Sequence, residues 1–223
     1  MKRNLEVFLI VVGCALVFSQ AARNHKPSPT PMPALATPAG QVKLYECPHL
    51  FDDPKTQNLF KKAESHRKDP SCLAEYDRLI ALQPNNPVGH YHKAYALDDQ
   101  NRPDAAILVV NRAIEIEPGF ANAWWLRAYC RDQSDQHKDW QLGVDDVSRA
   151  IDLDPDASNY DMRAGLLLKL GRLEEALADS DRAVRAEPAR DYLIQRAEIC
   201  EALGKLTEAA RDRKAASTAP EAN

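Results

Sequence analysis

From about Asp53 to the C-terminus, apolar residues form helical stretches that each end at a proline. These prolines follow one another at intervals of 34, 37, 33 and 32 residues, at Pro84, Pro118, Pro155, Pro188 and Pro220. Because proline cannot continue a helix, each of them marks a helix end. A period between about 20 and 50 residues indicates a chain built from stacked copies of one small structural unit.

Small residues stand at fixed distances before these prolines. In the second unit, Ala94, Ala106 and Ala113 precede Pro118 by 24, 12 and 5 residues. Once a three-residue insertion in the third unit is allowed, the same pattern recurs at Ala128, Gly143 and Ala150, at Ala164, Ala176 and Ala183, and at Ala197, Ala209 and Ala216. Two helices approach closely only where side chains are small. Each unit is therefore predicted to be a pair of packed helices, helix A followed by helix B.

This pattern resembles the tetratricopeptide repeat family. The resemblance is plainest in the segments NRPDAAILVVNRAIEIEP (101–118), GRLEEALADSDRAVRAEP (171–188) and GKLTEAARDRKAAS (204–217). It implies an all-α fold, a right-handed α-solenoid of about five antiparallel helix pairs. The repeat domain is expected to span residues 47–220, with units at about 53–86, 87–120, 121–156, 157–189 and 190–220.

Three places depart from the regular pattern. Phe60 and Cys72 replace two small residues of the first unit, so its helices are expected to be irregular. The insertion at residues 132–138 lengthens the turn inside the third unit, and we predict a protruding polar loop there. The last helical stretch, TEAARDRKAAS (207–217), is more polar than its counterparts, which is typical of a terminal unit that caps a stack.

The first 21 residues have the pattern of a secretory signal peptide. Lys2 and Arg3 precede an apolar run at residues 7–18, and residues 19–21 (SQA) supply the small residues of a cleavage site. Two alternatives stay open. One is a retained membrane anchor, although twelve apolar residues fall short of the roughly 20 in a spanning helix. The other is acylation of Cys14 in VVGC, as in bacterial lipoproteins.

A proline-rich segment at residues 22–46 separates this signal from the repeats. Its closely spaced prolines remove backbone donors and hold the chain extended, so it is predicted to be a flexible linker. The C-terminus carries no lumenal retention signal, and the chain has no Asn-x-Ser/Thr acceptor. We therefore expect an exported protein of the bacterial periplasm or cell envelope, with a membrane-anchored protein or lipoprotein as the alternative.

Composition and missing motifs exclude several classes of function. The formal net charge of −4 is too mild to attract polyanions, so nucleic acid is not an expected partner. The sequence contains no CxxC, no HExxH, no phosphate-cradling glycine-rich loop and no nucleophile elbow. We expect no enzymatic activity, no catalytic residue, no cofactor and no metal site.

Arginine and aspartate recur at matched places in three units. The expected pairs are Arg127 with Asp146, Arg163 with Asp179, and Arg196 with Asp212. Their repetition favours ion pairs that tie the two helices of one unit over an anion-binding site. Among the cysteines, Cys47 is close enough in sequence to the first unit to form a candidate disulfide with Cys72, with free buried thiols as the alternative.

The family resemblance also implies a concave groove lined mainly by A helices, with ligand-facing positions on each. The candidate peptide-binding residues are Tyr91, Tyr95, Asp98, Trp125, Tyr129, Asp132, Asp161 and Glu198. Aromatic side chains give contact area at low entropic cost, and carboxylates attract cations, so this set suits an extended peptide with apolar and basic side chains. The alternative is that the aromatic residues only complete packing between helices.

These observations favour an adaptor or scaffold that binds a peptide or partner protein in the groove. Other proteins or extended peptides are the expected partners, with a membrane tether through the N-terminus as an additional option. The competing hypothesis is a structural repeat protein of the envelope that assembles with copies of itself, although the polar last helix counts against open stacking.

Overall fold

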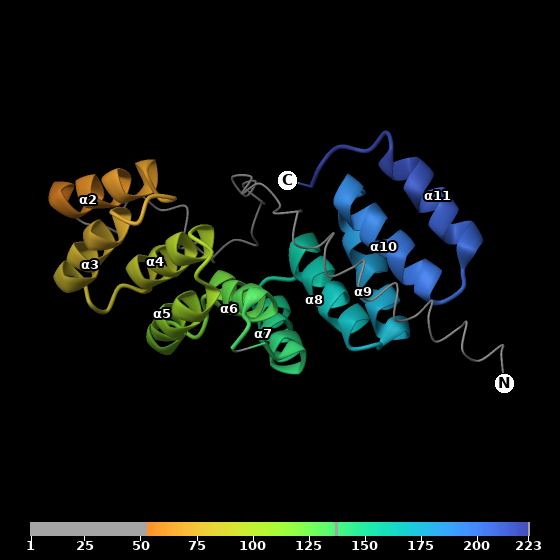
Figure 1. The fold of residues 1–223 in the computed structure, drawn as a ribbon, viewed down its shortest axis with the longest axis horizontal. Coiled ribbons are helices and arrows are strands. Elements are labelled where there is room, and N and C mark those ends of the chain that lie inside the picture. Colours follow the sequence, from red (N-terminus) through yellow and green to blue (C-terminus); the bar gives the residue numbers. More distant parts are fainter. Residues whose placement is uncertain (1–52, 137, 223) are drawn as a thin grey trace. The chain divides into compact units, whose positions relative to one another are not determined.

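The computed structural model describes residues 53–136 and 138–222, which belong to one compact unit, Thr37–Ala222. This part of the chain contains ten helices and no strand (Figure 1). The helices are α2 (Pro54–Ser65), α3 (Cys72–Leu82), α4 (Pro87–Asp99), α5 (Pro103–Ile116), α6 (Ala121–Gln133), α7 (Trp140–Leu153), α8 (Ala157–Lys169), α9 (Leu173–Ala186), α10 (Arg190–Ala202) and α11 (Leu206–Ala216). The predicted all-α fold is confirmed.

The even-numbered helices are the A helices of five successive pairs, and the odd-numbered helices are the B helices. Each A helix packs most extensively against the B helix that follows it. The predicted signal at residues 1–21 and linker at residues 22–46 lie outside the described residues. Within the described part of the chain, no helix has both the length and the apolar character that crossing a bilayer requires.

The turn from helix A to helix B has the same geometry in three units. Gly171 and Gly204 follow α8 and α10 with φ of +74°, and Asn101 follows α4 with φ of 59°. The next residue in the fourth unit, Arg172, donates its N–H to the carbonyl of Leu167 at 2.9 Å. A left-handed residue at this place lets the chain reverse while the last helix carbonyls stay hydrogen-bonded.

The small residues of the repeat pattern lie where helices touch. Ala94, Ala106 and Ala113 are completely buried. At Gly143 on α7, an added Cβ would lie 3.0 Å from a methyl carbon of Leu166 on α8. A larger residue there would push α7 away from the next unit, which explains why the pattern needs a small side chain at this position.

Neighbouring units contact one another through both kinds of helix, but unevenly. Besides the contacts of each B helix with the following A helix, the A helices α4, α6, α8 and α10 also touch in sequence. No comparable contact joins successive B helices within the described residues. The stack therefore curves with the A helices on its inner side.

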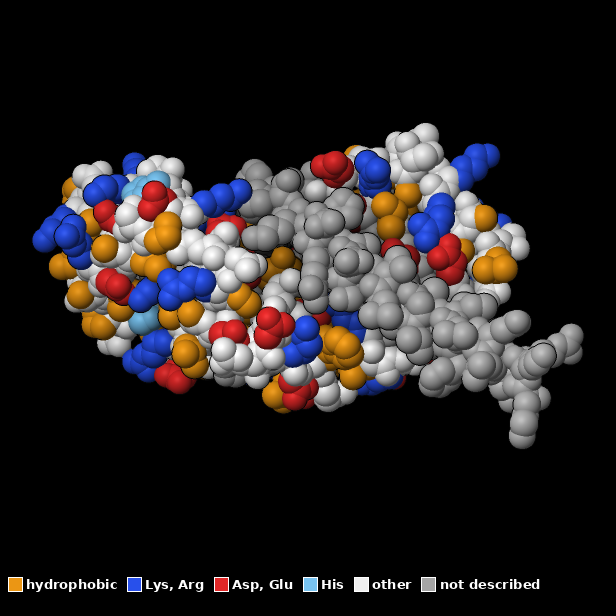
Figure 2. All heavy atoms as spheres, in the orientation of Figure 1, with side chains coloured by type: hydrophobic (Ala, Val, Ile, Leu, Met, Phe, Trp, Pro, Cys, Tyr) orange, Lys and Arg blue, Asp and Glu red, His pale blue; other side chains and the backbone are white. Residues whose placement is uncertain are grey.

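The structures of the first unit and of the insertion at residues 132–138 differ in part from the sequence predictions. The first unit forms two regular helices, because Ala63 on α2 supplies the fully buried small residue that Phe60 does not. In the insertion, Asp135, Gln136 and Lys138 are exposed, whereas Ser134 is buried and donates a hydrogen bond to Asp104. Figure 2 shows positive and negative side chains intermixed over the visible face of α2 to α7.

Candidate functional site

The A helices present two residues per unit on one shared face. These residues stand three positions before and one position after the buried small residue, so they lie four apart and one helical turn above each other. We call this set the A-helix face. It consists of Tyr91 and Tyr95 on α4, Trp125 and Tyr129 on α6, Asp161 and Gly165 on α8, and Ile194 and Glu198 on α10.

The tyrosines of α4 are largely used for packing. Tyr91 is only 8% exposed, and its ring centroid lies 4.9 Å from that of Phe120. The low exposure of Tyr91 favours the packing alternative over a ligand contact, because residues of the next unit cover its ring. Tyr95 is half-buried beside the guanidinium of Arg67, which lies 4.4 Å from its ring centroid.

The aromatic residues of α6 form a stacked pair. The rings of Trp125 and Tyr129 are nearly parallel, with an angle of 7° and centroids 5.3 Å apart. Both side chains are half-buried. The indole Nε1 of Trp125 is buried and has no hydrogen-bond partner. This pair therefore offers a flat apolar surface with one unsatisfied donor.

Two of the predicted acidic residues already have partners inside the chain. Asp132 on α6 accepts hydrogen bonds from the Nζ of Lys169 on α8, at 2.5 Å to each carboxylate oxygen. Asp98 on α4 lies 3.9 Å from the thiol of Cys130. Asp132 in particular is neutralised by its lysine, so it joins two units rather than standing free for a ligand.

Asp161 on α8 is in a different electrostatic state. Its Oδ1 is buried and has no hydrogen-bond partner. Burial, and to a smaller extent the negative charges of Asp191 and Glu198 on α10, raise the pKa of Asp161 to about 7. Burial also raises the pKa of Glu198, although Arg213 opposes this shift. These carboxyl groups form an acidic cluster that favours a cation.

The structure brings together each of the repeated arginine and aspartate residues. Arg127 bonds to Asp146 at 2.9 and 2.5 Å, Arg163 to Asp179 at 2.6 and 2.9 Å, and Arg196 to Asp212 at 2.8 and 2.7 Å. In all three, two guanidinium nitrogens contact the two oxygens of one nearly buried carboxylate. This forked geometry holds helix A against helix B within each unit.

The same basic residues also reach back to the preceding unit, a contact that the sequence reasoning missed. Arg127, Arg163 and Arg196 bond through Nη1 to side chains 16, 15 and 15 residues earlier, which are Asn111, Ser148 and Asp181. Lys93 makes the equivalent contact with Asp77 at 2.5 Å. A polar residue 15 or 16 positions before each basic residue is the sequence feature that could have predicted these contacts. These contacts hold neighbouring units in register.

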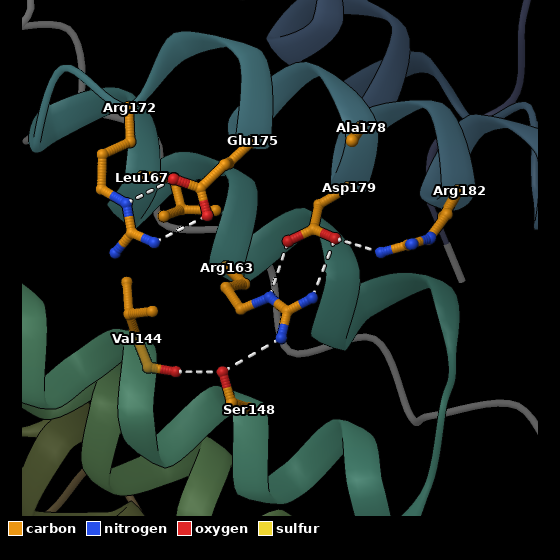
Figure 3. A pocket seen from close by; sticks show the side chains of 9 residues that line it. All are labelled: Val144, Ser148, Arg163, Leu167, Arg172, Glu175, Ala178, Asp179 and Arg182. Carbon is orange, nitrogen blue, oxygen red and sulfur yellow. Dashed lines mark hydrogen bonds and ion pairs between the residues drawn. The ribbon is translucent and has the colours of Figure 1, made fainter.

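The hollow around Arg163 shows why these arginines are structural. It encloses about 240 Å³ between α7, α8 and α9. Figure 3 shows Arg163 and Arg182 both directed at Asp179, and Arg172 at Glu175. Every arginine in it thus faces a carboxylate of the chain, which leaves no free cation to hold an anionic ligand.

Cys72 is a buried free thiol in the structure. The predicted bridge from Cys47 to Cys72 is therefore not seen, and Cys47 itself lies outside the described residues. Cys72 donates a hydrogen bond to the carbonyl of Arg67 at 3.3 Å, and it packs beside Ala63 and Tyr76 in the core of the first pair. Gln100, which follows α4, donates its Nε2–H to the sulfur of Cys72 at 3.5 Å, so residues of the first two units cover the thiol.

Comparison with known proteins decides the family. The tetratricopeptide repeat model matches residues 73–119, 91–158 and 162–220, which together make up more than half of the chain. The chain belongs to the tetratricopeptide repeat family. Proteins of this family serve in protein interactions, so a general protein-interaction role follows. No curated protein matches the sequence.

Solved structures of several repeat proteins have a similar fold. MamA from Desulfovibrio magneticus RS-1 aligns with a TM-score of 0.65 at 15% identity, over 74% of this chain and 94% of that chain. TTC0263 of Thermus thermophilus, a thermophilic repeat protein, gives 0.59 at 17% identity, over 72% and 89%. YrrB, described as having an unusual peptide-binding site, gives 0.57 at 14% identity, over 72% and 91%. At these identities the likeness shows the fold alone.

Proposed function

We propose that this repeat protein is an exported adaptor or scaffold that holds an extended peptide, or an extended segment of a partner protein, on its A-helix face. The observation that carries the proposal is the pair of unsatisfied polar atoms on adjacent A helices. Trp125 Nε1 on α6 and Asp161 Oδ1 on α8 are both buried without a partner, and both stand three positions before the buried alanine of their unit.

Buried polar atoms without partners destabilise a folded chain unless something else satisfies them. Extended peptides carry alternating backbone carbonyls and side chains, so one segment lying across α6 and α8 can supply an acceptor to the indole and a donor to the carboxylate. The parallel rings of Trp125 and Tyr129 add apolar contact area. Export rests on the signal-like pattern of residues 1–21.

A capture experiment tests the proposal. The chain from Ala22 onward, immobilised, is exposed to an envelope extract beside a variant with Trp125→Ala and Tyr129→Ala. A matched control carries Leu108→Ala, because Leu108 is 66% exposed on the B helix α5, away from the A-helix face. Circular dichroism verifies that all three proteins are folded.

The expected result is a partner that the parent and the Leu108→Ala control retain and that the double variant loses. Equal capture by all three folded proteins would contradict a binding role for the A-helix face. Light scattering of the same samples addresses self-assembly, since an adaptor keeps one mass across concentrations whereas an assembling protein grows.

A further inference from the structure

The strongest unexplained feature of the chain is the acidic cluster between α8 and α10. Gln195 on α10 donates its Nε2–H to the main-chain carbonyl of Asp161 on α8 at 2.7 Å. Asp191 stands four residues before Gln195, and Glu198 three residues after it, so all three lie along one side of α10. The hydrogen bond therefore holds Asp161 beside the middle of segment 191–198 of α10. The first and last residues of this segment are the acidic residues Asp191 and Glu198.

No cation of the chain neutralises this cluster within the described residues. Every charged group that shifts the ionisation of Asp161 is negative. Arg213 is the cation that acts on Glu198, yet its guanidinium is already bonded to Glu201 at 2.7 and 2.9 Å. Asp161, Asp191 and Glu198 thus differ from Asp132, Asp146, Asp179 and Asp212, each of which has its own lysine or arginine.

The position of the cluster links it to the neighbouring aromatic surface. Trp125, with its unsatisfied indole N–H, occupies on α6 the place that Asp161 occupies on α8, and these two helices touch. Gly165, one turn along from Asp161, lies under the side chain of Gln195, whose Oε1 would stand 3.3 Å from an added Cβ. A ligand lying across the A helices thus contacts the indole N–H of Trp125 and the stacked rings of Trp125 and Tyr129. It then reaches the carboxyl group of Asp161, which has no cationic partner within the described residues.

We propose that Asp161, Asp191 and Glu198 form a cation subsite that receives a lysine or arginine side chain of the bound peptide. This inference rests on the proposed function, because it assigns one side chain of the peptide held on the A-helix face. Ammonium and guanidinium groups both supply several N–H donors to carboxylates, and desolvated charge pairs of this kind are stronger than exposed ones. The subsite rejects peptides that bring an acidic residue to the same place.

Selection from a display library of random ten-residue peptides tests the subsite and does not require the natural partner to be identified. Three proteins are used, each as the chain from Ala22 onward: the parent, Asp161→Asn, and the control Glu174→Gln, which makes the same carboxyl-to-amide change at an exposed place on α9. The parent and the control are expected to enrich peptides with lysine or arginine at one fixed position among apolar residues. Asp161→Asn is expected to keep the apolar preference and lose the basic one.

The best selected peptide is then synthesised with lysine, arginine or glutamine at the enriched position, and binding is followed by fluorescence anisotropy. Replacing the basic residue with glutamine is expected to weaken binding to the parent at least about tenfold and to Asp161→Asn less than about twofold. The lysine and arginine peptides show which cation the site prefers.

The outcomes separate the two proposals. If the parent selects peptides without a basic position, or Asp161→Asn retains that position, the cation subsite is wrong while peptide binding stands. If the parent selects no peptide at all, both proposals fail. Melting curves of the three proteins establish that lost selectivity does not come from unfolding.

Discussion

Gln195 and Asp161 are joined by a hydrogen bond from the glutamine side chain to the aspartate main-chain carbonyl, at 2.7 Å. This bond links two A helices, α10 and α8, directly. It sets their register, and thereby places the Asp161 carboxyl among the negative charges of α10. The acidic cluster is therefore a consequence of how two repeats dock, and neither repeat contains it alone.

The first prediction concerns the pH dependence of stability. The pKa of Asp161 is raised to about 7 in the folded chain, from an ordinary value of 3.8, by burial and by Asp191 and Glu198. A raised folded pKa means that the folded state holds its proton more tightly than the unfolded state. The stabilisation from Asp161 is complete below about pH 4 and is lost as pH rises through 7.

Asp161→Asn removes this titration. The variant is expected to be more stable than the parent at pH 8, by on the order of 1 to 3 kcal/mol, with a smaller difference at pH 5. Urea unfolding at both pH values measures it, and Glu174→Gln serves as the matched control. A parent that gains stability between pH 5 and pH 8 relative to Asp161→Asn would contradict the assignment.

The second prediction concerns the forked ion pairs. Asp212 is 5% exposed and is held by two nitrogens of Arg196. Arg196→Ala leaves that carboxylate buried without its partner, so it is expected to lower the free energy of unfolding by about 3 kcal/mol. Arg213→Ala breaks an exposed pair with Glu201 and is expected to cost less than about 1 kcal/mol.

Chemical denaturation of both variants, and of the double variant Arg196→Met with Asp212→Leu, measures the difference. The double variant is expected to recover most of the loss, because it removes the buried charge along with its partner. Similar losses for Arg196→Ala and Arg213→Ala would show that burial of the carboxylate does not govern the energy.

The outcome for individual residues shows which features one sequence can reveal. The alanine offsets predicted the helix pairs because small residues must stand where two helices touch, and Ala94 and Ala106 are indeed fully buried. For Tyr91 the sequence left ligand contact and packing both open, since the choice depends on the ring of Phe120 in the next unit. Partners in other units decide whether a residue on the A-helix face is free.

Asp132 and Asp161 illustrate the same limit for charge. Both were candidate ligand contacts, yet Lys169, 37 residues further along the chain, neutralises Asp132. Asp161 receives no such partner and is instead half-buried near the carboxyl groups of Asp191 and Glu198. Spacing within one repeat carries no information on these contacts, because they depend on the curvature of the stack and on side-chain length.

The third prediction concerns the turn between helices A and B. Gly171 has φ of +74°, and no atom lies within 4 Å of the place where a Cβ would stand. Gly171→Ala is therefore expected to cost about 1 kcal/mol through the backbone conformation alone. Gly171→Asn should cost less, because Asn101 adopts the same conformation after α4. Equal losses for both, measured by urea unfolding, would locate the cost in packing.

The fourth prediction concerns thiol reactivity. Cys72, Cys130 and Cys200 are at most 3% exposed, and burial raises the pKa of all three thiols. Since the thiolate is the species that reacts, iodoacetamide at pH 8 is expected to leave these three unmodified in the folded chain and to label them once urea unfolds it. Mass spectrometry of peptides identifies the labelled cysteines.

The same experiment decides the state of Cys72 in the purified protein. If Cys72 is free, as it is in the structure, it reacts in urea without a reducing agent. If Cys47 is bridged to it, Cys72 stays unlabelled in urea until reductant is added, and a peptide linking the two cysteines appears.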